Sequence, residues 1–247
     1  PDEYPQVQSA DEVDFVPVKT QRLVRMIDRT LFSISSDESR PNLTGALLQV
    51  AEGRRLRMVS TDGHRLSLAE TGFDVDPETV FEPLRDGIIV PKKGLSELRR
   101  TVDLTEQDVL LGIHGTSAVF RYGRTTLFIR LIDGTFPHFS QVVPEEKDDR
   151  KATIDREELV GRVKLVSLFA SSKTNNLRLQ FEDDTCTISA QDPDKGECEE
   201  KIPIAYGGPS VRAGFNYRYL LDVLGTIEGE QVSVEMIDTL SPTIINE

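Results

Sequence analysis

Residues 56–69 read LRMVSTDGHRLSLA, two segments of alternating polarity that meet at an Asp-Gly pair. Asp-Gly between alternating segments predicts a β-hairpin, because the turn needs residues that tolerate a positive φ. The turn from Thr61 to Leu66 also carries a hydroxyl, a carboxylate, an imidazole and a guanidinium. These groups make it a candidate for a catalytic centre, for the rim of a binding pocket or for a purely structural turn.

The composition indicates a folded, soluble protein. The chain of 247 residues is long enough for one large domain or two ordinary ones. Its 38% hydrophobic and 29% charged residues argue against a disordered chain. No apolar run approaches the roughly 20 residues of a membrane span, and no signal peptide is present, so we expect a cytoplasmic protein. Cys186 and Cys198 indicate thiols in a reducing compartment rather than a disulfide framework.

The first half of the chain mixes helical and extended patterns. The spacing of apolar residues predicts helices over 18–33 and 94–102 and strands over 43–50, 56–60, 109–113, 117–122 and 125–132. The acidic segment 74–86 has no periodicity and is expected to be a loop. The charge run 145–150 contains no apolar residue, so we place a domain boundary there.

The second half repeats this order. Asp155 and Glu158 match a capping box that opens a helix over 156–170, and a second helix follows over 217–224. Residues 175–181 echo residues 41–47, and strands are expected over 185–190, 199–204, 231–237 and 243–245. Leu177 lies in a segment that echoes the one around Leu43. A duplication of this kind predicts an α+β fold in which helices cover antiparallel sheets.

The net charge of −13 alone argues against a nucleic-acid partner. However, the first predicted helix carries a stripe of four basic residues, Lys19, Arg22, Arg25 and Arg29, and the second has a basic side as well. An ordinary solvated helix face is the alternative. Stripes of one sign inside a chain of the opposite sign favour a basic binding face.

Several colinear motifs point to a known family: RPNLTGALLQV, LRMVSTDGHRLSLAE, IIVPKKGLSELRR, LIDGTFPHFSQVVP, LVSLFASSKTNNLRLQF and AGFNYRYLLDVL. Together they resemble the middle and third domains of the bacterial DNA polymerase III β subunit, the replication sliding clamp. The resemblance implies repeated DNA-clamp domains, each with two helices packed on antiparallel β-sheets. It implies a linker at 1–10, the middle domain at 11–146 and the C-terminal domain at 147–247. The family's first domain, last strand and apolar tail have no match here, and with Pro1 in place of methionine we expect a fragment.

The resemblance implies a processivity factor that is not an enzyme and needs no cofactor or metal. In the family, a homodimeric ring of three-domain chains encircles duplex DNA without sequence specificity. Short peptides tether the catalytic subunit of DNA polymerase III, the clamp loader and repair polymerases to that ring. The positions expected to face DNA are Arg22, Arg25, Arg29, Arg40, Lys92, Lys93, Arg99 and Arg100.

The family receives these peptides in a pocket between its second and third domains. The matching positions in this sequence are Leu43, Thr61, Gly63, His64, Arg65, Leu66, Pro137, Val142, Thr174, Asn216, Tyr219, Leu240 and Pro242. Apolar walls and a few polar groups suit the capture of an extended peptide. Gln141 stands where an arginine is usual, so one contact to the peptide is expected to be weaker.

Two other function classes are weighed against this one. An enzyme would use Asp62 and His64 as an acid–base pair, or as metal ligands with His114 or His138. The sequence offers no third ligand at a recognisable spacing, no nucleophile elbow and no phosphate loop. A β-rich interaction module without DNA would require the basic stripes to be coincidental.

Overall fold

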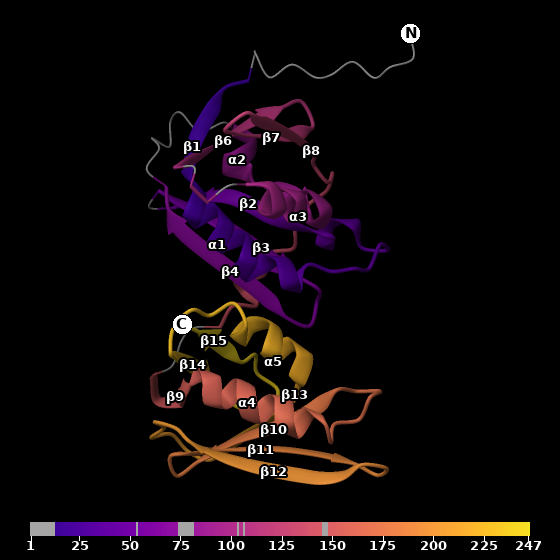
Figure 1. Cartoon of the computed structure of the whole chain (residues 1–247), viewed down its shortest axis with the longest axis vertical. Coiled ribbons are helices and arrows are strands. Elements are labelled where there is room, and N and C mark those ends of the chain that lie inside the picture. The colour runs from indigo at the N-terminus through magenta and orange to yellow at the C-terminus, as the bar shows by residue number, and fades with distance from the viewer. Residues whose placement is uncertain (1–12, 53, 74–81, 103, 106, 145–147) are drawn as a thin grey trace. The chain divides into compact units, whose positions relative to one another are not determined.

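The computed structural model describes residues 13–52, 54–73, 82–102, 104–105, 107–144 and 148–247 (Figure 1). The chain divides into two compact units, Pro1–Phe136 and Pro137–Glu247. The linker expected at 1–10, residues 145–147 of the charge run and most of the loop expected over 74–86 lie outside the described residues. The domain boundary expected between residues 146 and 147 therefore stays a prediction.

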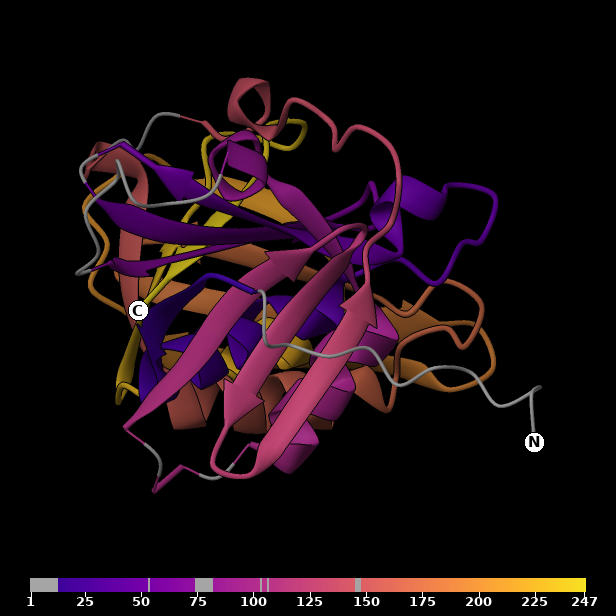
Figure 2. The same ribbon diagram turned by 90° about the horizontal axis from the view of Figure 1, so that it is seen from above.

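The first unit is built on antiparallel sheets. Its strands are β1 (Phe15–Lys19), β2 (Gly45–Ala51), β3 (Arg55–Thr61), β4 (Leu66–Gly72), β5 (Ile88–Pro91), β6 (Asp108–His114), β7 (Ser117–Tyr122) and β8 (Thr125–Arg130). Within the described residues they form two sheets, in the orders β1-β6-β7-β8 and β4-β3-β2-β5. Figure 2 shows β6, β7 and β8 lying side by side. The helices are α1 (Thr20–Thr30), α2 (Glu82–Asp86) and α3 (Lys92–Thr101).

Helix α1 covers β3 and β4 and also contacts α3. Its apolar stripe, which includes Leu23 and Ile27, is buried in the core of this unit. The prediction that this helix starts at residue 18 was wrong. Val16 and Val18 are buried while Pro17 and Lys19 are exposed, which is the period-two pattern of a strand, so the helix begins only at Thr20.

Helix α2 lies at the end of the segment expected to be a loop. Its Leu84 is fully buried, and the helix contacts β2. One buried leucine is too short a pattern to reveal helical periodicity. The described end of this segment is therefore helical because of tertiary packing, which the local sequence does not report.

The second unit has a related construction, in which the described residues form no counterparts of α2 and β8. Its strands are β9 (Lys151–Asp155), β10 (Asn176–Glu182), β11 (Thr185–Asp192), β12 (Gly196–Pro203), β13 (Val211–Asn216), β14 (Gln231–Glu235) and β15 (Ile244–Asn246). Its helices are α4 (Arg156–Ser167) and α5 (Tyr217–Leu224), which contact one another. The sheet orders in the described residues are β12-β11-β10-β13 and β15-β14-β9.

These orders confirm the predicted duplication and the α+β class. Strands β9 to β13 take the places of β1 to β5, and β14 and β15 take those of β6 and β7. The equivalence drawn between Leu43 and Leu177 was wrong. The backbone N–H of Lys92 donates to the carbonyl of Thr44, and that of Tyr217 donates to the carbonyl of Asn175. Thr44 is thus equivalent to Asn175, because the hydrogen-bond register fixes the alignment.

The caps of the second-unit helices follow the sequence. Asp155 Oδ1 accepts a hydrogen bond from the backbone N–H of Glu158 at 2.8 Å, which confirms the predicted cap of α4.

Both cysteines are free thiols, and Cys186 is buried. None of the helices in the described ranges is long and apolar enough to cross a membrane.

Candidate functional site

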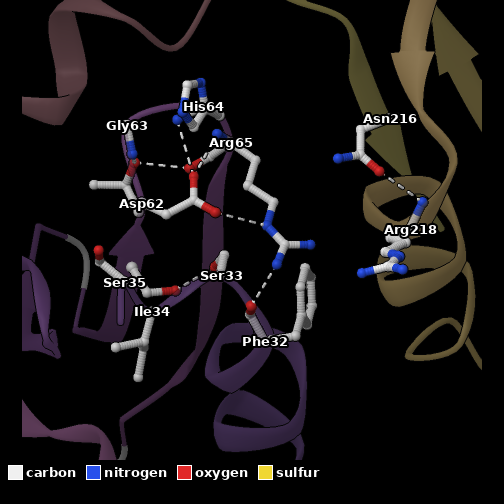
Figure 3. A network of polar contacts seen from close by, with 12 residues as sticks. Phe32, Ser33, Ile34, Ser35, Asp62, Gly63, His64, Arg65, Asn216 and Arg218 are labelled. Atoms are coloured by element: carbon white, nitrogen blue, oxygen red, sulfur yellow. Dashed lines mark hydrogen bonds and ion pairs between the residues drawn. The ribbon is translucent and has the colours of Figure 1, made fainter. Parts of the chain in front are cut away.

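The turn from Thr61 to Leu66 joins β3 to β4, and these two residues pair across the hairpin. Gly63 has a φ of +92°, which explains the need for glycine in this turn. Asp62 Oδ1 accepts hydrogen bonds from the backbone N–H groups of His64 and Arg65 at 2.9 and 3.0 Å (Figure 3). Thr61 Oγ1 donates to the carbonyl of Arg65 at 2.7 Å. The predicted hairpin is confirmed, and its polar groups hold its own backbone.

The side chain of Arg65 anchors the turn to the end of α1. Its Nε lies 3.1 Å from Asp62 Oδ2, and its Nη2 donates to the carbonyl of Phe32 at 2.7 Å. The guanidinium also lies 5.2 Å from the centroid of the Phe32 ring. The side chains of Asp62 and Arg65 are only 17% and 19% exposed. Both oxygens of the Asp62 carboxylate are therefore used to fix the turn.

A buried hydroxyl network lies below the turn. Ser60 Oγ donates to the carbonyl of Thr30 at 2.6 Å, and the hydroxyls of Ser60 and Ser33 are 2.5 Å apart. All three residues are fully buried. This network was not predicted from the sequence. Serines at inward positions of an apolar strand and of a helix end are a usable signal for it, because buried hydroxyls need partners. The network ties β3 to the end of α1.

Arg40 lies against the same turn. Its Nη2 donates to the carbonyl of Asp62 at 3.1 Å, and its Nε lies 2.8 Å from Asp37 Oδ2. Hydrogen bonds from Ser39 and Arg40 lower the pKa of the Asp37 carboxyl. Arg40 thus brings the short helix Pro41–Leu43, which holds the buried Leu43, beside the turn. Its expected approach to DNA stays a prediction.

The acid–base hypothesis for Asp62 and His64 gains no support from this geometry. The Asp62 carboxylate is committed to the turn, and Figure 3 shows the His64 imidazole pointing away from it. His114 ends β6, and His138 lies in the loop before the short helix Phe139–Gln141. No group of three or more His, Cys, Asp or Glu side chains in the described part of the chain is arranged to hold a metal ion.

The other expected peptide contacts lie in the second unit. Asn216 Oδ1 accepts from the backbone N–H of Arg218 at 3.0 Å and so caps α5, which carries the half-buried Tyr219. Leu240 is 95% exposed. Asp238 Oδ1 accepts from the backbone N–H groups of Leu240 and Ser241, both at 2.7 Å, and fixes this loop. The remaining positions, Pro137, Val142, Thr174 and Pro242, are exposed.

The basic residues expected to face DNA lie mainly on α1 and α3. The sequences of these two helices contain seven basic and two acidic residues. Arg99 of α3 forms an ion pair with Asp28 of α1, at 2.7 Å between Nε and Oδ1. Arg22 Nη1 donates to the carbonyl of Gly72 at 3.0 Å. Lys19 does not belong to the helical stripe, as it ends β1 and pairs with Asp108 at 3.1 Å.

The chain matches known proteins along almost its whole length. The family model for the central domain of the DNA polymerase III beta subunit matches residues 17–138, and the model for its C-terminal domain matches residues 140–247. The beta sliding clamp of Caulobacter vibrioides is 34% identical over 98% of this chain, and that of Pseudomonas aeruginosa is 36% identical over 93%. The chain spans 64% and 61% of the lengths of these relatives.

Solved structures agree with these matches. A crystal structure of the DNA polymerase sliding clamp from Pseudomonas aeruginosa with ligand has a TM-score of 0.90 and 30% identity, and the match covers 100% of this chain and 65% of that one. The sliding clamp of the same species bound to griselimycin has a TM-score of 0.88 and 33% identity, with coverage of 100% and 65%. This chain therefore belongs to the DNA polymerase III beta subunit family, of which it carries the central and C-terminal domains.

Proposed function

We propose that this chain is the central and C-terminal part of a bacterial sliding clamp. In this role it is a non-catalytic processivity factor of cytoplasmic DNA replication, and the three-domain protein closes as a homodimeric ring around duplex DNA. The observation that carries the proposal is the duplicated unit, whose two copies match the two family domains in order. The relatives that share this order are named beta sliding clamps.

The DNA-facing surface is proposed to be formed by α1 and α3. Their seven basic residues contrast with a chain whose net charge is −13. Contacts of lysine and arginine to phosphate do not depend on sequence and weaken with salt, as a protein that moves along DNA requires. The residues assigned to this role are Arg22, Arg25, Arg29, Arg40, Lys92, Lys93, Arg99 and Arg100.

The hairpin turn is proposed as a docking rim for clamp-binding peptides of the polymerase, the clamp loader and repair polymerases. Its hydrogen bonds hold the backbone in a fixed shape, so little conformational entropy is lost when a peptide docks. Leu66 supplies the apolar contact at the start of β4. Tyr219, Leu240 and the other second-unit positions named above are proposed to contact the same peptide.

The docking proposal is tested by replacing Leu66 with glutamate. A clamp-binding peptide of the glutamine–leucine–aromatic type should bind the unmodified chain and should lose at least about tenfold in affinity, because a charge cannot be desolvated against its apolar anchor. Titration calorimetry measures the affinity. Leu68→Glu is the matched control, since Leu68 is 42% exposed on the same strand. Equal binding by the Leu66→Glu variant and the unmodified chain would contradict the proposed site.

The ring is tested on the three-domain protein. A closed ring stays on circular duplex DNA at salt concentrations that remove it from linear DNA, because threading does not depend on phosphate contacts. Gel filtration of the loaded DNA separates bound from free protein. Equal loss of protein from both forms of DNA would contradict the encircling role.

A further inference from the structure

Two carboxylates lie among the basic residues of α1 and α3. Asp28 Oδ1 is 2.7 Å from Arg99 Nε, and Glu97 Oε1 is 2.6 Å from Arg100 Nη2. The four side chains are between 37% and 72% exposed, so they remain accessible to an anion from solution. Arg99 and Arg100 thus each carry an intramolecular anion at the group that a phosphate would use.

The position of Asp28 needs a reason beyond the stability of its own helix. It lies in the last turn of α1, where the helix dipole disfavours a negative charge. Its partner comes from another helix, and the hydrogen bond to Asp28 raises the pKa of Arg99. Glu97 is likewise surrounded by positive charge. The hydrogen bond from Arg100 and the nearby charges of Arg100 and Lys93 lower the pKa of its carboxyl.

We propose that Asp28 and Glu97 compete with DNA phosphate for Arg99 and Arg100. They thereby lower the affinity for duplex DNA of the α1–α3 face, which is formed by the basic residues of these two helices. The inference rests on the proposed function, since it requires this face to meet DNA. A phosphate that binds Arg99 or Arg100 competes with a carboxylate for the same guanidinium, so the weakened ion pair offsets part of the stabilisation that the phosphate provides. The face stays basic enough to attract DNA but binds it loosely.

The two competitors are not equal. Glu97 and Arg100 lie three residues apart on one helix, and Arg100 is 72% exposed, so water and salt already weaken their pair. Asp28 and Arg99 lie on different helices, with side chains 42% and 37% exposed. Arg100 donates two hydrogen bonds to Glu97 and Arg99 donates one to Asp28, but the greater exposure of Arg100 favours displacement of Glu97. Removal of the Asp28 charge is therefore expected to have the larger effect.

The test measures binding of the chain to a short fluorescein-labelled duplex by anisotropy, over a series of KCl concentrations. Asp28→Asn keeps an oxygen that accepts from Arg99 and removes the charge. It should tighten binding by about two- to fivefold, the range expected for release of one partly exposed ion pair. The salt dependence should steepen by up to about 0.9 in log–log slope for each additional phosphate that the protein neutralises. Glu97→Gln should give a smaller increase.

Asp183→Asn is the matched control. It makes the same charge change on the exposed β10–β11 turn of the second unit, where Asn tolerates the φ of +46°. If Asp28→Asn and Asp183→Asn increase the affinity for the duplex equally, the change in net charge alone explains the effect, and the inference is overturned. Weaker binding by Asp28→Asn would overturn it as well, because Asp28 would then orient Arg99 toward DNA. If that variant does not fold, Glu97→Gln against Asp183→Asn decides by the same criteria.

Lys93→Gln separates the inference from the proposed function. Lys93 is exposed on α3, and loss of its charge should weaken binding to the duplex. If Lys93→Gln binds as well as the unmodified chain, the DNA-facing assignment of this helix is wrong. If Lys93→Gln weakens binding to the duplex and Asp28→Asn does not strengthen it, the DNA-facing assignment of α3 is supported. Only the proposed role of Asp28 as a competitor of phosphate is then wrong.

Discussion

The carboxylate of Asp62, a candidate acid–base group in the sequence, forms hydrogen bonds that hold the turn together. It accepts from two backbone N–H groups and from the side chain of Arg65. Carboxylates in short turns commonly bond to the backbone in this way. The polar side chains of the turn therefore stabilise its backbone conformation. The residues beside the turn determine what the turn can bind.

Replacement of Asp62 by alanine should destabilise the first unit by about 1–3 kcal/mol, because N–H groups and a guanidinium lose a charged acceptor. Urea unfolding followed by circular dichroism measures the change. If the turn is the docking rim proposed above, peptide affinity should fall with it, because the turn loses its fixed backbone. His64→Ala is the control, because His64 is exposed, and its stability should stay within about 0.5 kcal/mol of the unmodified chain. Equal losses in both variants would refute the role of Asp62.

Burial raises the pKa of the Cys186 thiol to about 12, from an ordinary value of 9.0. The folded state therefore keeps the proton over a pH range in which the unfolded state releases it. The contribution of this thiol is complete below pH 9 and is lost as pH rises toward 12, by up to about 1.4 kcal/mol per pH unit.

Urea unfolding at about pH 8 and about pH 10 measures this loss, since the interval spans the pKa of the unfolded thiol. Cys186→Ala has no thiol to titrate, so its stability should fall less over the same interval. An identical fall in both proteins would mean that other groups account for the alkaline sensitivity.

The sequence predicted those helices, strands and turns that periodicity and turn chemistry encode. The bounds of β7 and α5 were predicted to the residue, and the Asp-Gly hairpin was found from its turn. The predicted bounds were wrong where one residue fits both the helical and the strand periodicity. Val18 fits both a helical stripe and an alternating strand, and only pairing of β1 with β6 decides between them. Leu43 was placed in a strand because it is apolar, yet it lies in a short helix before β2.

The candidate site was predictable only in part. The identity of the turn could be predicted from its residues, whereas the roles of Phe32 and Arg40 could not. Arg65 reaches the carbonyl of Phe32, 33 residues away, and Arg40 reaches that of Asp62, 22 residues away. Contacts over such separations depend on the fold, and no local pattern in a single sequence specifies them.

Loss of the Asp155 cap should destabilise the second unit by about 1 kcal/mol, the usual cost of replacing an aspartate N-cap with alanine. Urea unfolding of Asp155→Ala measures the change. Glu157→Ala is the control, since its side chain is 85% exposed and lies 3.7 Å from Arg156 in a weak ion pair. If the control loses as much stability as Asp155→Ala, helix charge rather than the cap is responsible.

The two copies of the unit share a strand order but not a charge pattern. Helices α1 and α3 carry seven basic and two acidic residues, whereas α4 and α5 carry four basic and three acidic ones. The copies also bury separate cores, and none of the residues that the structure describes belongs to both. Because the two copies share a strand order but differ in helix charge, they are suited to different contacts.

The separate cores predict that residues 13–136 and 137–247 fold as independent proteins, because each unit buries its own apolar side chains. Each should unfold cooperatively in urea. The proposed contacts come from both units, so the clamp-binding peptide should bind either part at least about tenfold more weakly than it binds the chain, in which the two groups of proposed contacts are linked. Titration calorimetry on the parts, their mixture and the chain measures this. Full affinity in one part alone would place the whole docking site within that unit.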